Sequence, residues 1–518
     1  MTDISLSRDV VDPTKWGLCS MSVANREAEL KFELQLSEID RLRNHATLRD
    51  LTVGRATTRT LVSIYYDTED DALFNVGLSL RVRKVGRKWV QTVKRGKPIP
   101  GGLSPPIELE APVPIFEPRF DAISDLKIAE EIVRQIGEAT LLARYETHMR
   151  RTVRNLTVDE GTVEFAFDNG EIVAGERKLP FVEAELELTG GSLGVLYQAA
   201  RFLFDDGPIR FSAMSKAARG YRLAHGEEPN PIASRKGLDH HMKAGITSEE
   251  AYADILRACL DRIAHNRLAT ISGDDPEGPH QLRVTLRRLR SAFKVFRIMA
   301  DTPEICRLDA EAQRMRQLVG ELRDADVLIA DIVCPATGAP ADGTKALIAT
   351  LEARRVKACA HVVASLSKPF VNALLLDLGR YAETRGWLGE NIEQTAALAR
   401  PIGDLAREAL ARRWKSCTKA AKGLEKLDIE QRHVLRKKLK QFRYAVEFFA
   451  GPCKGQEAEA VLGGPEGVAG CLWLSERRRH GAAPCRYRSR HPCRPRSLAH
   501  DRRICHGLAS DQCGPCLG

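Results

Sequence analysis

Charged side chains recur at every second position in several short segments of the N-terminal half of this sequence. The acidic sets are Glu27/Glu29, Glu108/Glu110, Glu164/Asp168 and Glu183/Glu185/Glu187, and the basic ones are Lys31, Arg81/Arg83, Lys94, Arg150/Arg151 and Lys216. Alternate residues of a strand share one face, so each set is expected to lie on a single face. Carboxylates hold hard cations such as Mg²⁺ or Mn²⁺, and Arg and Lys bind phosphate oxygens. The combination suits phosphoryl transfer to or from a polyanionic phosphate chain.

Eight segments with this alternation predict β-strands separated by Gly-rich turns. They are residues 27–34, 60–66, 79–85, 88–94, 107–111, 147–153, 162–168 and 181–188. We expect a closed barrel whose lumen carries the charges. The competing interpretation is a sheet whose outer face alternates charge for solubility, but the same pattern on five or more strands favours the lumen.

These segments resemble a known family. Glu27-Ala-Glu-Leu-Lys31 is similar to the Glu-x-Glu-x-Lys signature that opens CYTH domains, the triphosphate tunnel metalloenzymes. Later segments resemble that family in the same order: LSLRVRK, QTVKRG, VEFAFDNGEI, FVEAELELTGG and SKAARGYRL. The resemblance covers residues 27–223. It implies an eight-stranded antiparallel tunnel that hydrolyses triphosphate-containing substrates such as inorganic triphosphate with a divalent metal, Mg²⁺ or Mn²⁺.

The resemblance also implies a role for each matching residue. The metal-side carboxylates would be Glu27, Glu29, Glu183 and Glu185, and the phosphate-side cations would be Lys31, Arg81, Arg83, Lys94 and Lys216. Glu27, Glu29 and Lys31 would be catalytic. Arg150 and Arg151 remain alternatives for a further phosphate-side cation, because the strand register there is ambiguous by one residue; we assign Arg151.

The C-terminal half has helical periodicity and an internal repeat. HQLRVTLRRLRSAFKVF begins at His280, and HVLRKKLKQFRYAVEFF begins at His433. At about 100° per residue, each repeat has an apolar stripe and a separate basic stripe. The basic stripes contain His280, Arg283, Arg287, Arg290 and Lys294 in the first copy and His433, Arg436, Lys440 and Arg443 in the second. An ordinary solvated face is the alternative, but cations four residues apart repel one another, so uncompensated stripes favour an anion-binding face.

This half is similar to the CHAD domain over residues 246–450, on the strings HQLRVTLRRLRSA and VGELRDADVL. The resemblance implies polyphosphate binding. Nucleic acid is the competing partner, but no aromatic residues interleave with the basic stripe to stack on bases, which disfavours it. A net charge of +10 agrees with a polyanionic partner.

The chain of 518 residues is long enough for two to four domains. We predict an α+β protein with an N-terminal extension (1–20), a tunnel domain (21–225), a linker (226–245), a helical bundle domain with an internal repeat (246–450) and a tail (451–518). No apolar stretch has the length of a membrane-spanning helix, and the N-terminus lacks the pattern of a signal peptide. We therefore expect a cytoplasmic protein without a membrane partner.

The tail has no amphipathic pattern, and seven of the 13 Cys fall in it. A zinc site is one interpretation, but the spacings repeat no zinc pattern; a shifted reading frame near Gly451 accounts for more. Missing closing helices would then leave Leu435, Leu439, Phe442, Val446 and Phe449 partly exposed. The functional prediction is a metal-dependent triphosphatase whose helical domain binds polyphosphate. A non-catalytic polyphosphate-binding scaffold and a nucleotide cyclase are the alternatives.

Overall fold

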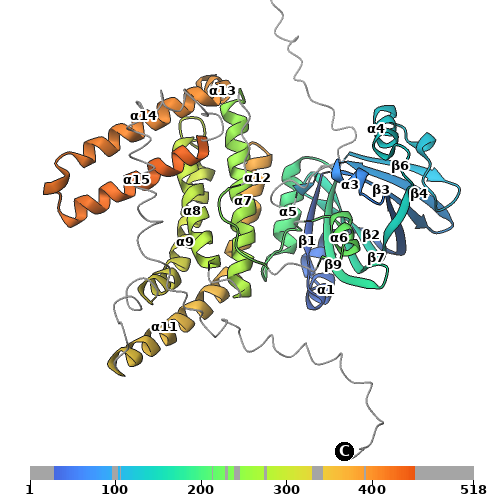
Figure 1. Cartoon of the computed structure of the whole chain (residues 1–518), viewed down its shortest axis with the longest axis horizontal. Helices are drawn as coiled ribbons and strands as arrows, with labels where there is room; N and C mark the ends of the chain where they lie inside the picture. Colours follow the sequence, from blue (N-terminus) through green and yellow to red (C-terminus); the bar gives the residue numbers. More distant parts are fainter. Residues whose placement is uncertain are drawn as a thin grey trace, which may run out of the picture.

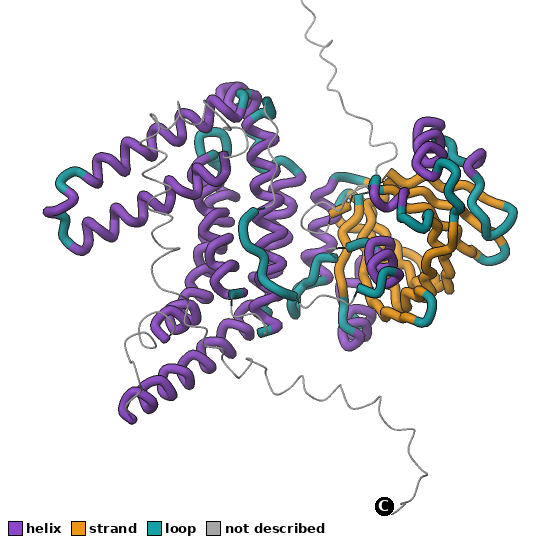
Figure 2. The backbone as a smooth tube through the Cα atoms, in the orientation of Figure 1, coloured by secondary structure: helices purple, strands orange, loops and turns teal. Residues whose placement is uncertain are grey.

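The computed structural model describes residues 28–95, 103–104, 107–212, 214–227, 232–238, 245–273, 277–329, 342–389 and 392–449. A strand-rich part and a helical part lie side by side (Figures 1 and 2). Glu27 and the proposed frame-shifted tail lie outside the described residues, so their predictions stand as made.

One antiparallel sheet forms the strand-rich part, in the order β5-β1-β9-β8-β7-β2-β3-β4-β6. Its strands are β1 (Glu29–Glu33), β2 (Thr52–Asp67), β3 (Leu78–Val85), β4 (Lys88–Arg95), β5 (Leu103–Ser104), β6 (Ile107–Val113), β7 (Leu142–Val158), β8 (Gly161–Ala174) and β9 (Arg177–Gly190). The eight expected strands are confirmed, and the two-residue β5 is an addition. The two edge strands, β5 and β6, are separated by only two residues, so this stretch of chain pairs with β1 on one side and β4 on the other and closes the tunnel.

The alternation in β1 shows why the charged face points inward. Leu30 and Phe32 are fully buried and belong to the core outside the sheet, beside α5 (Leu193–Leu203). Glu29 and Lys31 therefore face the lumen. The remaining helices of this part are α1 (Leu36–Arg43), α2 (Ala46–Leu51), α3 (Ala72–Asn75), α4 (Leu126–Ile136) and α6 (Lys216–Ala224).

The helical part is built around α7 (Ser248–Ser272), which begins with a capping box between Thr247 and Glu250. The other helices are α8 (Gly278–Val295), α9 (Pro303–Val327), α11 (Asp342–Leu366), α12 (Pro369–Glu383), α13 (Ile392–Ala399), α14 (Ile402–Ala421) and α15 (Ile429–Phe449). In the described part of the chain, no single helix is long and apolar enough to cross a membrane, although Lys345–Leu366 and Pro369–Glu383 meet that criterion as a pair bent by 54°.

The expected exposure of the second repeat's apolar stripe is wrong for three of its five residues. Leu435, Phe442 and Phe449 are 7%, 1% and 1% exposed, whereas Leu439 and Val446 are partly exposed, as expected. Helix α14 covers one side, where Trp414 lies 5.4 Å from Phe442 between ring centroids, and α8 covers the other, where Phe296 lies 6.2 Å from Phe449. The three buried residues are therefore covered by helices that precede them in the chain.

Candidate active site

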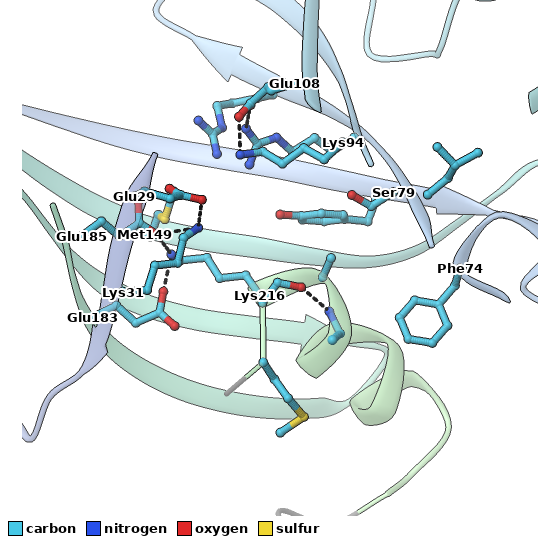
Figure 3. Close-up of a pocket in the computed structure, with 18 of the residues that line it drawn as sticks. Glu29, Lys31, Phe74, Ser79, Lys94, Glu108, Met149, Glu183, Glu185 and Lys216 are labelled. Carbon is cyan, nitrogen blue, oxygen red and sulfur yellow. Dashed lines mark hydrogen bonds and ion pairs between the residues drawn. The ribbon is translucent and has the colours of Figure 1, made fainter. Parts of the chain in front are cut away.

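The lumen contains a cavity of about 510 Å³ lined mainly by charged side chains (Figure 3). Every described residue to which the sequence analysis gave a metal-binding or phosphate-binding role in the tunnel lines it: Glu29, Lys31, Arg81, Arg83, Lys94, Arg151, Glu183, Glu185 and Lys216. Glu108, Glu110 and Glu187 also line this cavity. Residues that lie far apart in the sequence, from Glu29 to Lys216, therefore line one cavity because the sheet closes.

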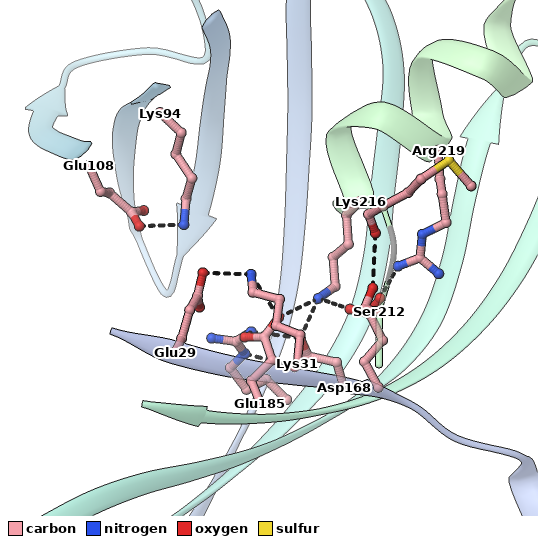
Figure 4. Close-up of polar contacts among 12 residues, drawn as sticks. Glu29, Lys31, Lys94, Glu108, Asp168, Glu185, Ser212, Lys216 and Arg219 are labelled. Carbon is pink, nitrogen blue, oxygen red and sulfur yellow. Dashed lines mark hydrogen bonds and ion pairs between the residues drawn. The ribbon is translucent and has the colours of Figure 1, made fainter. Parts of the chain in front are cut away.

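One wall of the cavity is a neutralised cluster on β7, β8, β9 and α6 (Figure 4). The Lys216 ammonium lies 2.9 Å from an Asp168 oxygen and 2.8 Å from a Glu185 oxygen, and it also pairs with Glu183. Arg151 donates two hydrogen bonds to Asp168, at 2.7 and 2.6 Å. Burial would raise the pKa of Glu185, but Arg151 and Lys216 outweigh it and hold that pKa well below its usual range. Glu185 is therefore held in its ionised form.

Helix α6 carries Lys216 into the lumen at its first residue. The Ser215 hydroxyl caps this helix by accepting from the Ala218 amide. Gly220 lets α6 approach β7, since a Cβ there would lie 2.2 Å from the Tyr145 ring. One turn after Lys216, Arg219 pairs with Glu183.

Asp168 and Arg219 are site residues that the sequence assignment omitted. Asp168 was in the alternating acidic sets, but no role was transferred to it. Arg219 lies three residues after Lys216, and that spacing places both side chains on one helix face. The helical spacing within SKAARGYRL was the signal that could have found Arg219.

Lys31 bridges this cluster to Glu29. Its ammonium lies 2.9 Å from a Glu29 oxygen and 3.5 Å from a Glu185 oxygen. Burial would lower the pKa of Lys31, but Glu185 and Glu29 outweigh burial and raise it. Lys31 is therefore a fixed positive charge facing the cavity.

The opposite wall, on β3 and β4, has cations with less compensation. Arg81 donates to Glu108 at 3.0 Å, and Lys94 pairs with the same carboxylate. Arg83 donates to the Ser63 hydroxyl at 3.0 Å, and no ion pair joins it to a carboxylate within the described ranges. Burial, and then repulsion from Arg81, lowers the pKa of Arg83 to about 10. An anion bound here would relieve that repulsion.

The register of β7 decides between the two arginines that the sequence left open. Arg151 lines the cavity and pairs with Asp168 on β8, whereas Arg150 points to the exposed face. The alternation that buries Met149 in the lumen also places Arg151 there.

Two groups of carboxylates could hold a divalent metal. Asp168, Glu183 and Glu185 offer oxygens within 4.8 Å of one another, but Lys216, Arg151 and Arg219 already pair with them. The second group is Glu187 with Glu164 and Glu29. Burial, and then the negative charges of Glu164 and Glu29, raise the pKa of Glu187. Lys31 offsets part of the charge of Glu29 at 2.9 Å, but the carboxylates around Glu187 still raise its pKa, and hard oxygen donors in a negative field fit a hard divalent cation.

The basic residues of the helical part are only partly brought together. Arg283 pairs with Asp324 at 2.7 Å, and Arg290 pairs with Asp309 at 2.6 Å. Both acids lie on α9, so the expected uncompensated stripe is wrong at these two positions. Lys294, His433 and Arg436 are exposed.

The two repeat copies meet at Tyr444 on α15. Arg287 of α8 donates to the Tyr444 hydroxyl at 3.1 Å, and Arg443 lies 5.1 Å from the centroid of its ring. Nearby, burial and then Arg323 lower the pKa of His280, although Glu277 opposes them. Burial and then Arg283 likewise lower the pKa of Arg316. Glu447 of α15 pairs with Arg443 at 3.3 Å and with Arg288 at 2.7 Å. Basic residues still outnumber acidic ones here, because Arg287 has no such carboxylate partner among the described residues.

Family comparisons agree with this architecture. The CYTH domain family matches residues 25–221, and the CHAD domain family matches residues 254–468, past the predicted boundary at 450. The chain therefore contains a CYTH domain followed by a CHAD domain.

Among individual proteins, the chain is 30% identical over 196 residues to an inorganic triphosphatase of Haemophilus influenzae. That match covers 38% of this chain and about half (54%) of the relative. Among solved structures, the CHAD domain from the plant Ricinus communis is 28% identical, covering 47% of this chain and 79% of that one, with a TM-score of 0.40. A putative adenylyl cyclase from Hippeastrum, described as having a dominant triphosphatase activity, is 22% identical over 39% of this chain and 97% of its own, with a TM-score of 0.27. The CYTH domain and the curated relative support triphosphate hydrolysis at the level of the family.

Proposed function

We propose that the CYTH tunnel hydrolyses inorganic triphosphate, or another triphosphate-containing substrate, with a divalent metal, Mg²⁺ or Mn²⁺. The observation that carries the proposal is the division of one cavity into a cationic wall around Arg83 and a carboxylate end around Glu29 and Glu187. A phosphate chain complements the first, and a metal complements the second. The predicted cytoplasmic location belongs to the same proposal.

In this proposal the chain's own residues bind and orient the substrate. Arg81, Arg83 and Lys94 take the non-bridging phosphate oxygens, which relieves their mutual repulsion. A water oxygen forms a bond to the terminal phosphorus as the anhydride P–O bond breaks, giving phosphate and diphosphate. Lys31 and Lys216 stabilise the charge that develops on the reacting oxygens. A metal at Glu29 and Glu187, with Glu27 as a further predicted ligand, would neutralise phosphate charge when bound.

Phosphate release tests the function directly. Inorganic triphosphate, ATP and long-chain polyphosphate are each incubated with the protein, with and without Mg²⁺ or Mn²⁺. We expect metal-dependent release of phosphate from triphosphate. Cyclic nucleotide from ATP without phosphate release would instead support a cyclase, and no turnover of any substrate with either metal would leave the non-catalytic scaffold.

The variant Glu187→Gln tests the metal end. Because the raised pKa means that folded protein holds this proton more tightly than unfolded protein, the ionised group costs stability, and the cost grows until the pH exceeds the folded pKa. At pH 8 without metal, the variant should therefore melt about 2 °C higher than the unsubstituted protein. Its stabilisation by Mg²⁺ or Mn²⁺ should be smaller. Calorimetry measures both, with Glu176→Gln in the exposed β8–β9 turn as the matched control.

We further propose that the CHAD domain binds polyphosphate where its two repeat copies meet. The cations that the sequence assigned are His280, Arg283, Arg287, Arg290, Lys294, His433, Arg436, Lys440 and Arg443. The surplus positive field around Arg287 and Arg443 supports this placement most strongly.

Replacing Arg287 and Arg443 together with Gln is expected to weaken polyphosphate binding about tenfold at low salt. Fewer counterions are then released on binding, so the slope of log affinity against log salt should fall by about 1. The matched control removes the same charge from two exposed, locally paired arginines, Arg297 and Arg407. Equal losses in both double variants would show that only the net charge matters.

A further inference from the structure

Two buried polar side chains of the CHAD domain reach across to the segment 204–212 of the CYTH domain. The Asn372 amide of α12 donates to the Phe204 and Gly207 carbonyls at 3.0 and 2.6 Å, and its oxygen accepts from the Ile209 amide at 3.3 Å. Arg267 of α7 donates to that same Asn372 oxygen at 2.9 Å and to the Ile209 carbonyl at 3.5 Å. Figure 1 shows α12 lying between α7 and α5, where these contacts occur.

Both side chains are costly to bury. Arg267 is 0% exposed and Asn372 is 1% exposed. The third acceptor of Arg267 is the Leu366 carbonyl, so its hydrogen-bond acceptors among the described residues are all neutral, and burial lowers its pKa to about 9. Apolar residues would fill an interface at lower cost, whereas this network fixes the geometry of the segment that it holds.

Segment 204–212 in turn forms backbone hydrogen bonds with β1, the strand that carries Glu29 and Lys31. The Glu33 amide donates to the Arg210 carbonyl at 2.8 Å, and the Ser212 amide donates to the Lys31 carbonyl at 2.9 Å. An antiparallel bridge joins Phe32 to Phe211 between them. Gly207 permits the bend before this stretch, because its φ of +70° favours glycine.

The same segment leads directly into the lumen lysine of α6. Ser212 precedes Lys216 by four residues, and Figure 4 shows Ser212 beside Lys216. Lys31 and Lys216 both meet the same Glu185 oxygen, at 3.5 and 2.8 Å. The segment therefore links the backbone of one lumen lysine to the start of the helix that carries the other.

We infer that Arg267 and Asn372 are positioning residues for the tunnel: through segment 204–212, the CHAD domain sets the spacing of Lys31 and Lys216. This inference rests on the proposed function for its kinetic readout. It assigns the helical domain a part in triphosphate hydrolysis that is separate from any polyphosphate bound at Tyr444.

The test compares Asn372→Leu with Tyr197→Leu in the full chain. Leucine at 372 keeps the approximate size and removes all of the amide's hydrogen bonds. Tyr197 of α5 packs on Gly379 of α12 in the same interface but makes no described hydrogen bond to segment 204–212. We expect Asn372→Leu to lower kcat/KM for triphosphate about tenfold, and Tyr197→Leu to change it less than twofold at an equal loss of melting temperature.

Asn372→Asp is the second variant, in case the leucine variant does not fold. It keeps the acceptor for Ile209 and Arg267 and loses the two donated bonds, so we expect a loss of about threefold. Equal kinetic losses at equal melting temperature in the Asn372 and Tyr197 variants would overturn the inference. If the unsubstituted protein does not hydrolyse triphosphate, the proposed function fails, and triphosphate affinity measured by calorimetry still decides the inference: weaker binding only in the Asn372 variants supports it, and unchanged binding overturns it.

Discussion

Replacing Lys31 with methionine is expected to lower triphosphate turnover about a thousandfold in a protein that remains folded. The ammonium faces the cavity, and its charge is fixed by Glu29 and Glu185. Removing one preorganised positive group that stabilises developing phosphate charge costs about 10²–10³ in rate, and loss of substrate binding adds to it. Methionine retains the length of the stem, and Glu185 keeps Arg151 and Lys216 as partners. Phosphate release at saturating triphosphate measures the effect.

Lys178→Met is the matched control for this prediction. Lys178 lies on β9, the strand that carries Glu185, but its side chain is 61% exposed and pairs with Glu171 outside the cavity. Its turnover should stay within twofold of the unsubstituted protein, and both variants should keep their far-ultraviolet circular dichroism. Turnover by Lys31→Met above a tenth of the normal rate would remove Lys31 from the catalytic set.

The period-two charge pattern predicted which strand residues face the tunnel, because a strand fixes which side chains share a face. Lys216 lies at the start of helix α6 and was assigned through the family resemblance. A one-residue ambiguity, as between Arg150 and Arg151, reverses the face and needs the register with β8 to settle it. Asp168 shows a further limit. Its pairing with Arg151 and Lys216 depends on three elements meeting, and no single-strand pattern reports that.

The helical half shows a different limit of sequence patterns. A stripe on α8 reveals repulsion among its own residues but not the charges of neighbouring helices. Asp309 and Asp324 of α9 neutralise Arg290 and Arg283, which are two of the four Arg and Lys residues of the stripe. The contact of Arg287 with Tyr444 joins residues 157 positions apart, which the repeat suggested only by similarity.

The polar stretch at 226–245 predicted a linker between two domains, but the interface between those domains indicates that the first depends on the second for its stability. Tyr197, Leu196 and Leu203 of α5 are at most 1% exposed, and one apolar core includes them together with residues of α7 and α12. Exposing a large apolar side chain costs ~1.5–3 kcal/mol, so exposing several approaches the ~5–15 kcal/mol that stabilises a domain. The isolated fragment 21–225 is therefore expected to aggregate or to melt at least ~10 °C below the full chain.

A nicked full chain separates the role of the interface from that of the linker. A protease site inserted between Glu227 and Ile232 leaves both domains and every described contact between them in place. After cleavage, the two halves should co-elute in gel filtration and keep the melting temperature of the intact chain, because buried apolar surface and the Asn372 network join them. A fragment 21–225 that is monodisperse and melts with the full chain would show instead that the CYTH domain needs no partner, and halves that separate after cleavage would show that the linker alone had held them.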